Sequence, residues 1–334
     1  MVPLVLIILV NRCISIKYQP SISTAFCTTC CGGVKFNLSE ELVITYHQFQ
    51  CYLCSQIDHF SSNISNTRDK QRISRFIFRT NDASLEKLAM PFRSIVTETK
   101  LRNPNDIQVY FSGDDRSYFI DLNFPQYLSC YRLLVPGAFQ ADLFRLLVLY
   151  RYGGVYVDIS VRFLKPLDDI IYYANDGFVA VKEIYDYGIQ QTFIASYKEH
   201  PLVGTMIDRV ISMISQRGYG LGAGDITGPK ILMLAFNSFF KFPPRRSING
   251  GSYSLNGFKL KFLYHSILHA EEGNFMSLVQ GNTKSAELQK KFKGYHELMY
   301  GNGLNGTKHY FKHWQERTVY RLDIKNESCP LPLH

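Results

Sequence analysis

The stretch from residue 138 to residue 158 constrains the fold more than any other part of the chain. Residues 138–152 place apolar side chains at helical spacing along one stripe, which predicts a helix with one buried face. Gly153 and Gly154 end this helix, because glycine adopts the left-handed conformation of a helix cap without steric cost. Residues 155–158 then form a short apolar run that ends on a carboxylate, Asp158. A helix, a glycine turn and a strand in this order predict an α/β fold.

The neighbouring segments continue this alternation. Strands are predicted at residues 73–78, 106–111, 177–181, 192–195 and 257–264, and helices at residues 84–99, 201–214 and 230–240, with 117–124 helical or extended. Strands that alternate with helices favour a mostly parallel sheet with helices on both faces. We therefore predict a Rossmann-like α/β domain.

The length of 334 residues suits one large α/β domain with an appendage. We predict three regions: an N-terminal apolar targeting segment with a cysteine-rich lead-in (1–70), the α/β domain (71–321) and a C-terminal tail (322–334). A hydrophobic content of 46% with 19% charged residues excludes a disordered chain. The net charge of +9 is scattered over the sequence, which favours phosphate-bearing small molecules or an anionic membrane over nucleic acid.

The first ten residues form an apolar run that is too short to span a bilayer, which needs about 20 residues. Its length fits the core of a secretory signal, although no basic residue precedes it and Arg12 follows it. The alternative is a buried strand. We expect a signal or short anchor, and with it a membrane-associated or lumenal protein.

Cysteines cluster near the N-terminus. Five of the eight are Cys27, Cys30, Cys31, Cys51 and Cys54, and they include two CxxC pairs. Such pairs suit a zinc ribbon in a reducing compartment and disulfides in a secretory one. Glycosylation sequons at Asn37, Asn63, Asn305 and Asn326 favour the secretory compartment, so we expect disulfides.

The residues that carry chemistry lie in the same helix-turn-strand unit. Asp158 follows a strand at the sheet edge where open α/β proteins bind ligands, and Asp142 and Arg145 share a helix face. If this face meets that edge, one cation and two acids can hold sugar hydroxyls, a diphosphate and a divalent ion. The alternatives are a surface ion pair for Asp142 and Arg145 and a turn-capping role for Asp158.

Residues 140–158, QADLFRLLVLYRYGGVYVD, resemble the signature of the glycosyltransferases with the Asp-x-Asp sugar-binding region. These include yeast-type α-1,6-mannosyltransferases, inositol phosphorylceramide mannosyltransferases and animal α-1,4-glycosyltransferases. Residues 73–80, 110–115 and 227–229 carry shorter similarities, and residues 309–321 a looser one. The resemblance covers roughly residues 73–240 and implies the GT-A fold.

The resemblance also implies the site residues. Asp142, Arg145 and Asp158 would be catalytic, with Asp158 as the first acid of Asp-x-Asp. The donor-binding set would be Phe78, Asp115, Asp142, Arg145, Tyr152, Gly153, Gly154, Asp158, Ser160, Thr227, Gly228, Pro229, His313 and Trp314. His200 and His309 are further candidates for contacts.

The family uses Mn²⁺ or Mg²⁺, which its second acid binds directly, but here Ser160 replaces that acid. The implied metal ligands are Asp158 and Ser160, and a serine hydroxyl is a weak ligand for a hard cation. Three outcomes stay open: Ser160 acts through water, Arg162 or Lys165 replaces the ion, or the protein is catalytically weak.

We therefore predict a glycosyltransferase that moves a hexose or N-acetylhexosamine from a UDP- or GDP-sugar to a glycan or glycolipid hydroxyl. The resemblance implies retention of configuration and a Golgi or secretory location. The alternatives are an inactive relative that binds nucleotide-sugar or glycan, a zinc-dependent interaction module at residues 27–54, and a hydrolase. The hydrolase lacks an evident second carboxylate pair.

Overall fold

The computed structural model describes residues 43–60, 71–184, 187–267, 274–278, 286, 288–290, 310–323 and 329. The N-terminal apolar run, Cys27, Cys30, Cys31, the four sequons and His309 lie outside these residues, so their roles stay predictions. Within the described ranges, no helix has the length and apolar character needed to cross a membrane.

One mixed sheet organises the described part of the chain, in the order β1-β3-β2-β4-β7-β6-β9-β10-β11-β5, with β8 paired to β9. Its first half is parallel, from β1 through β3 and β2 to β4. From β4 onward most pairs are antiparallel, and β6 with β9 is a parallel exception. The strands are β1 (Ile44–Thr45), β2 (Phe76–Thr80), β3 (Ile107–Phe111), β4 (Gly154–Val157), β5 (Val161–Phe163), β6 (Phe178–Lys182), β7 (Ile189–Ser196), β8 (Gly251–Leu255), β9 (Phe258–Ile267), β10 (Asn274–Ser277) and β11 (Leu288–Lys290).

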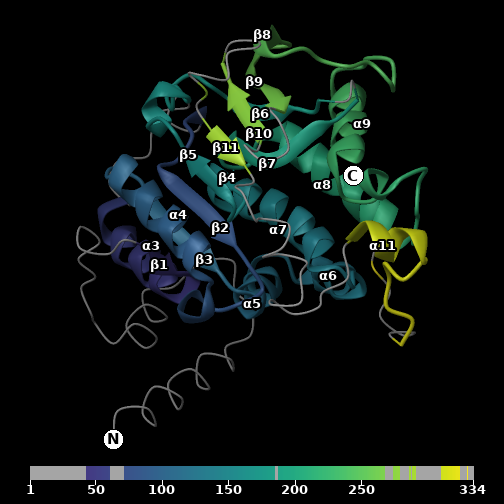
Figure 1. The fold of residues 1–334 in the computed structure, drawn as a ribbon, viewed down its shortest axis with the longest axis horizontal. Helices are drawn as coiled ribbons and strands as arrows, with labels where there is room; N and C mark the ends of the chain where they lie inside the picture. Colours follow the sequence, from purple (N-terminus) through teal and green to yellow (C-terminus); the bar gives the residue numbers. More distant parts are fainter. Residues whose placement is uncertain are drawn as a thin grey trace, which may run out of the picture.

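Helices cover the sheet, as Figure 1 shows, with α3 and α4 near β1 to β3 and α8 and α9 toward the other end. The α-helices are α3 (Tyr46–Phe60), α4 (Met90–Arg102), α5 (Gly113–Asn123), α6 (Leu128–Leu133), α7 (Gly137–Tyr152), α8 (Pro201–Ser215), α9 (Pro229–Phe239) and α11 (Tyr310–Gln315). Alternate residues of β2 and β4 point into different core clusters: Phe78 and Tyr156 into the larger, Ile77 and Val155 into a second. The predicted α/β class, a central sheet flanked by helices, is confirmed, and the sheet mixes parallel and antiparallel pairs.

The turn between α7 and β4 requires glycine at both of its positions. Gly153 and Gly154 have φ values of 65° and 103°, which L side chains rarely adopt. A Cβ on Gly153 would lie 2.6 Å from the Lys198 nitrogen, and one on Gly154 would lie 2.8 Å from the Phe76 carbonyl oxygen. The turn therefore lets β4 enter the sheet directly after α7.

Two predicted boundaries differ from the structure. The sheet begins at β1, and Tyr46 and Phe49 of α3 are fully buried in the main core, so part of the predicted lead-in belongs to the domain. The helix predicted at 84–99 begins only at Met90, because Pro91 fits the first turn of a helix and not its interior. Cys51 is disulfide-bonded, which favours disulfides over zinc at this cysteine.

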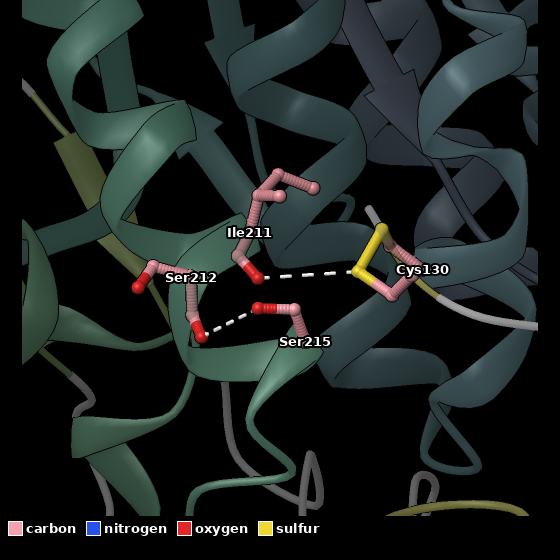
Figure 2. The surroundings of a disulfide bond; sticks show 5 residues. Cys130, Ile211, Ser212 and Ser215 are labelled. Carbon is pink, nitrogen blue, oxygen red and sulfur yellow. Dashed lines mark hydrogen bonds between the residues drawn. A yellow bond between two sulfur atoms is a disulfide. The ribbon is translucent and has the colours of Figure 1, made fainter. Parts of the chain in front are cut away.

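A second disulfide joins Cys130 of α6 to Cys329, 199 residues later. Figure 2 shows it beside Ile211, Ser212 and Ser215 of α8, and the Cys329 sulfur lies 3.9 Å from the Ile211 carbonyl oxygen. The predicted C-terminal tail is thus fastened to the helical layer.

Replacing Cys130 and Cys329 together by serine is expected to lower the free energy of unfolding by about 2–4 kcal/mol, because the bond closes a long loop in the unfolded chain. Denaturant unfolding of the wild type and the double variant measures this difference. Reduced wild type should be at least as destabilised as the variant, because reduction also breaks the disulfide of Cys51. Equal midpoints for all three samples would contradict the expectation.

His200 is a fully buried residue at the N-terminus of α8, where its Nδ1 accepts a hydrogen bond from the Leu202 nitrogen. Burial lowers the pKa of His200 from the ordinary 6.5 to about 3. The folded protein therefore keeps this ring neutral where the unfolded chain binds a proton, so its contribution is present above pH 6.5 and is lost as pH falls toward 3.

We expect the free energy of unfolding to fall below pH 6.5 by up to about 1 kcal/mol per pH unit from His200. His200→Asn keeps a capping oxygen but removes the titrating ring, so its stability should depend less on pH. Urea unfolding at several pH values tests this, and parallel profiles for both proteins would refute it.

Candidate active site

Asp142, Arg145 and Asp158 meet at the C-terminal end of β4. Arg145 Nη2 lies 2.8 Å from Asp142 Oδ1, and Arg145 Nη1 lies 3.4 Å from Asp158 Oδ1. The two acids come from α7 and from the turn after β4, and the glycine turn between these elements sets their separation. The structure thus brings together the three side chains singled out as catalytic.

Neighbouring groups stabilise the charged form of Arg145. Its side chain is only 7% exposed, and burial by itself disfavours the cation. Tyr156, Asp142 and Asp158 outweigh burial and raise the pKa of Arg145 above its ordinary value. The guanidinium also lies over the Tyr156 ring, 4.6 Å from its centroid.

Tyr156 contacts both Arg145 and Asp158. Burial, with a contribution from Asp158, raises the pKa of Tyr156, although Arg145 lowers it. The phenol therefore stays protonated and donates to Asp158 Oδ1 at 3.2 Å. Asp158 keeps 22% of its side chain exposed, so a ligand can reach it.

The segment Thr227-Gly228-Pro229 also contributes to this site, although it is distant from Asp142 in the sequence. Thr227 Oγ1 donates to Asp142 Oδ2 at 2.8 Å. Gly228 and Pro229 open α9, and a Cβ on Gly228 would lie 2.8 Å from Gly224 Cα. The glycine therefore permits the close approach that places Thr227 against Asp142.

An irregularity in β7 supplies contacts that sequence reasoning missed. Ala180 of β6 pairs with Ile194, but the next residue, Val181, pairs with Gln190, so intervening residues of β7 bulge from this ladder. Arg145 Nη1 donates to the Gln191 carbonyl oxygen at 2.5 Å, and the Gln191 amide donates to the Thr227 carbonyl oxygen at 2.5 Å. The sequence signal is the pair of adjacent glutamines near the start of this strand.

Arg79 is a second residue that sequence reasoning missed. It is fully buried, and its guanidinium donates to the carbonyl oxygens of Asp158 and Val161 at 2.7 and 3.0 Å. Thr99 Oγ1 and Gln108 Oε1 accept its other hydrogen bonds. Burial lowers the pKa of Arg79 to about 9, which still leaves it cationic at neutral pH. Arg79 thus fixes the turn that carries Asp158.

The described residues do not show a metal site at the ligands implied by the resemblance. Ser160 is only 2% exposed, and Asp158 Oδ1 already contacts Tyr156 and Arg145. No cluster of three histidine, cysteine or acidic residues with metal-binding geometry occurs in the described residues. Arg162 pairs with Glu98 at 2.9 Å, so that pairing competes with its proposed role as a substitute cation.

Four predicted donor-binding residues have structural roles. Phe78 is fully buried in the aromatic core, so its side chain offers no surface to a ligand. Tyr152 and Gly153 precede β4 and Gly154 begins it, so all three lie at the opposite end of that strand from Asp158. Their part of the signature builds the turn and does not contact the site.

Asp115 closes the first turn of α5, because its carboxylate accepts hydrogen bonds from the Ser112 nitrogen and hydroxyl. His313 Nδ1 lies 2.9 Å from Thr318 Oγ1, and Trp314 Nε1 donates to the Tyr219 carbonyl oxygen at 2.8 Å. Their helix, α11, packs on α7 through Tyr310 and Phe139, whose ring centroids are 5.8 Å apart. This packing brings α11 to the N-terminal part of the helix that carries Asp142.

Residues 58–175 match the family described as glycosyltransferase sugar-binding region containing DXD motif. This region of the chain is therefore similar to a glycosyltransferase sugar-binding region. It contains Arg79, Asp142, Arg145 and Asp158, while Thr227 and Gln191 lie beyond it.

Curated relatives agree with this family. Inositol phosphoceramide mannosyltransferase 3 of Schizosaccharomyces pombe is 24% identical over 142 residues, which are 42% of this chain and 39% of the relative. The initiation-specific alpha-1,6-mannosyltransferase of Candida albicans is 43% identical over 47 residues, 14% of this chain and 12% of the relative. The chain thus matches well under half the length of each relative.

Two solved structures also align with the chain. PaToxG Glycosyltransferase has 18% identity and a TM-score of 0.37, with 57% of this chain and 80% of that chain covered. Mouse xyloside xylosyltransferase 1 has 9% identity and a TM-score of 0.29, with 52% and 84% covered.

Replacing Arg79 by methionine is expected to lower the free energy of unfolding by about 3 kcal/mol or more, because buried acceptors would lose a charged donor. Arg162→Met is the matched control: its ion pair is half-exposed and should contribute about 0–1 kcal/mol. Denaturant unfolding compares the variants, and similar losses would show that Arg79 does not anchor the turn.

Proposed function

We propose that the protein is a glycosyltransferase that moves a hexosyl group from a nucleotide-sugar to a hydroxyl of a glycan or glycolipid. One observation carries the proposal: the buried Arg145 cation lies between Asp142 and Asp158 at the end of β4, within the residues that match the family. The partial match to the relatives leaves the activity of the whole chain a proposal.

Transfer requires that negative charge on the departing diphosphate be stabilised as the glycosidic bond breaks. Arg145 supplies a fixed cation for this charge, and Asp142, Thr227 and Gln191 hold the guanidinium and its surroundings in place. Asp142 and Asp158 offer carboxylate oxygens to hydroxyl groups of the donor.

The names of the curated relatives make mannose the first donor sugar to test. Retention of configuration and a site in the secretory lumen are part of the same proposal. The disulfides of Cys51 and Cys130 support an oxidising compartment, where such bonds persist.

A second candidate is an inactive relative that binds a nucleotide-sugar or a glycan. The buried Ser160, in the place of the family's second acid, is the observation that favours it. Turnover of a donor separates the two candidates.

The test is nucleotide release from GDP-mannose, with UDP-galactose and UDP-N-acetylglucosamine beside it. Release from one donor is expected, and Asp158→Asn should lower kcat/KM by roughly 100-fold or more, because the site loses one of its two charges next to Arg145. Asp168→Asn is the control, since this exposed acid pairs with Arg75 away from β4 and should leave release unchanged.

The same assay in EDTA is expected to lose only part of its rate. No release from any donor by folded protein, with methyl α-mannoside and myo-inositol supplied as acceptors, would leave the inactive relative as the better account. Complete loss in EDTA would mean that Asp158 and Ser160 hold an ion in spite of their surroundings.

A further inference from the structure

Glu183, Gln190 and His265 form a polar group on the same edge of the sheet as Asp158; we call it the acidic-imidazole cluster. Gln190 is near the start of β7, Glu183 follows the end of β6, and His265 is near the end of β9. Asp158 joins this edge through its backbone nitrogen, which donates to the Thr192 carbonyl oxygen at 2.9 Å. Gln190 is two residues from Thr192 on β7.

The cluster is held together by the imidazole. Gln190 Nε2 lies 3.1 Å from His265 Nδ1, and Glu183 Oε1 lies 3.7 Å from the same nitrogen. The side chain of His265 is 3% exposed and that of Glu183 is 19% exposed, while Gln190 is 8% exposed. Glu183 is therefore the member that solvent reaches most easily.

Two buried atoms of the cluster have no hydrogen-bond partner in the structure, Gln190 Oε1 and His265 Nε2. When Nδ1 accepts from the Gln190 amide, the neutral ring carries its hydrogen on Nε2. The cluster then presents one unpartnered acceptor and one unpartnered donor. A hydroxyl group supplies both complements, because it donates one hydrogen bond and accepts others.

The cluster adjoins the donor side of the candidate active site. If Gly188 carried a Cβ, that atom would lie 3.0 Å from Pro229 Cβ and 3.1 Å from Glu183 Cβ. Glu183 and Pro229 therefore both lie next to Gly188. Pro229 belongs to the segment whose Thr227 donates to Asp142.

Consecutive glutamines of β7 connect the two groups. Gln191 contacts Arg145 and Thr227 through its carbonyl oxygen and its amide, whereas Gln190 contacts His265. The donor groups come from α7, β4 and α9, and the cluster comes from β6, β7 and β9. A molecule that contacts the cluster would thus lie next to a donor held by Arg145.

We propose that the acidic-imidazole cluster binds a hydroxyl of the acceptor sugar, an inference that rests on the proposed transferase function. His265 Nε2 donates to this hydroxyl and Gln190 Oε1 accepts from it. His265 and Gln190 are thereby acceptor-binding residues.

The test compares two replacements of His265. Asparagine retains a polar group near Nδ1 and removes the one at Nε2, whereas glutamine retains a group near Nε2. With the donor that the wild type uses, release to water is measured alone, and transfer is measured with methyl α-mannoside as the acceptor probe. His265→Asn is expected to raise KM for the probe roughly tenfold, the effect of one hydrogen bond, with donor KM and release to water unchanged.

His265→Gln should stay within about threefold of the wild type in the same measurement. His200→Asn is the matched control, because His200 is also a buried histidine with an unpartnered Nε2, but it lies near Gly177, at the start of β6 and the opposite sheet edge. It should leave KM for the probe unchanged even where stability falls. Unfolding curves show whether each variant is folded.

Several outcomes would overturn the assignment. Equal effects of asparagine and glutamine would exclude Nε2 as the contacting atom, and a change in donor KM alone would place the bound hydroxyl on the donor. An unchanged KM for the probe in a folded His265→Asn variant would leave the cluster as internal structure. Wild type that turns over no donor would instead refute the transferase proposal itself.

Discussion

The buried ion pairs of Arg145 are the interaction on which the candidate site depends. A guanidinium that is 7% exposed is stable only when nearby groups compensate its desolvation. Asp142 on the same helix, Asp158 at the end of β4 and the Gln191 carbonyl in β7 provide this compensation. Three elements must therefore assume one relative position before the cation is satisfied, so the site and the central packing of the sheet form together.

The position of Asp158 also depends on Arg79, which contacts the backbone of the same turn. Its hydrogen bonds go to backbone carbonyls and neutral side chains, so among the described residues no carboxylate compensates its charge by direct contact. The nearby Asp158 charge raises its pKa against the larger effect of burial. The position of Asp158 is thus set from both sides by arginines, Arg145 at its carboxylate and Arg79 at its carbonyl.

The sequence predicted what depends on local pattern, including helix α7, its glycine stop, strand β4 and the shared face of Asp142 and Arg145. It did not predict Arg79 or Gln191, because their partners are mainly backbone groups, which carry no residue-specific signal. Gly153 and Gly154, which the resemblance assigns to the donor site, lie at the opposite end of β4 from Asp158. A family signature contains residues that build the turn as well as residues that bind, and only the direction of each side chain separates them.

The charge balance around these arginines gives a physical reason for Ser160 in place of an acid. In the described site two cations, Arg79 and Arg145, stand against two carboxylates, Asp142 and Asp158, so the residues nearly cancel in charge. A further carboxylate at position 160 would be buried, since this residue is 2% exposed, and it would need a cation to offset its desolvation. A serine there leaves the local charge balanced by protein groups alone.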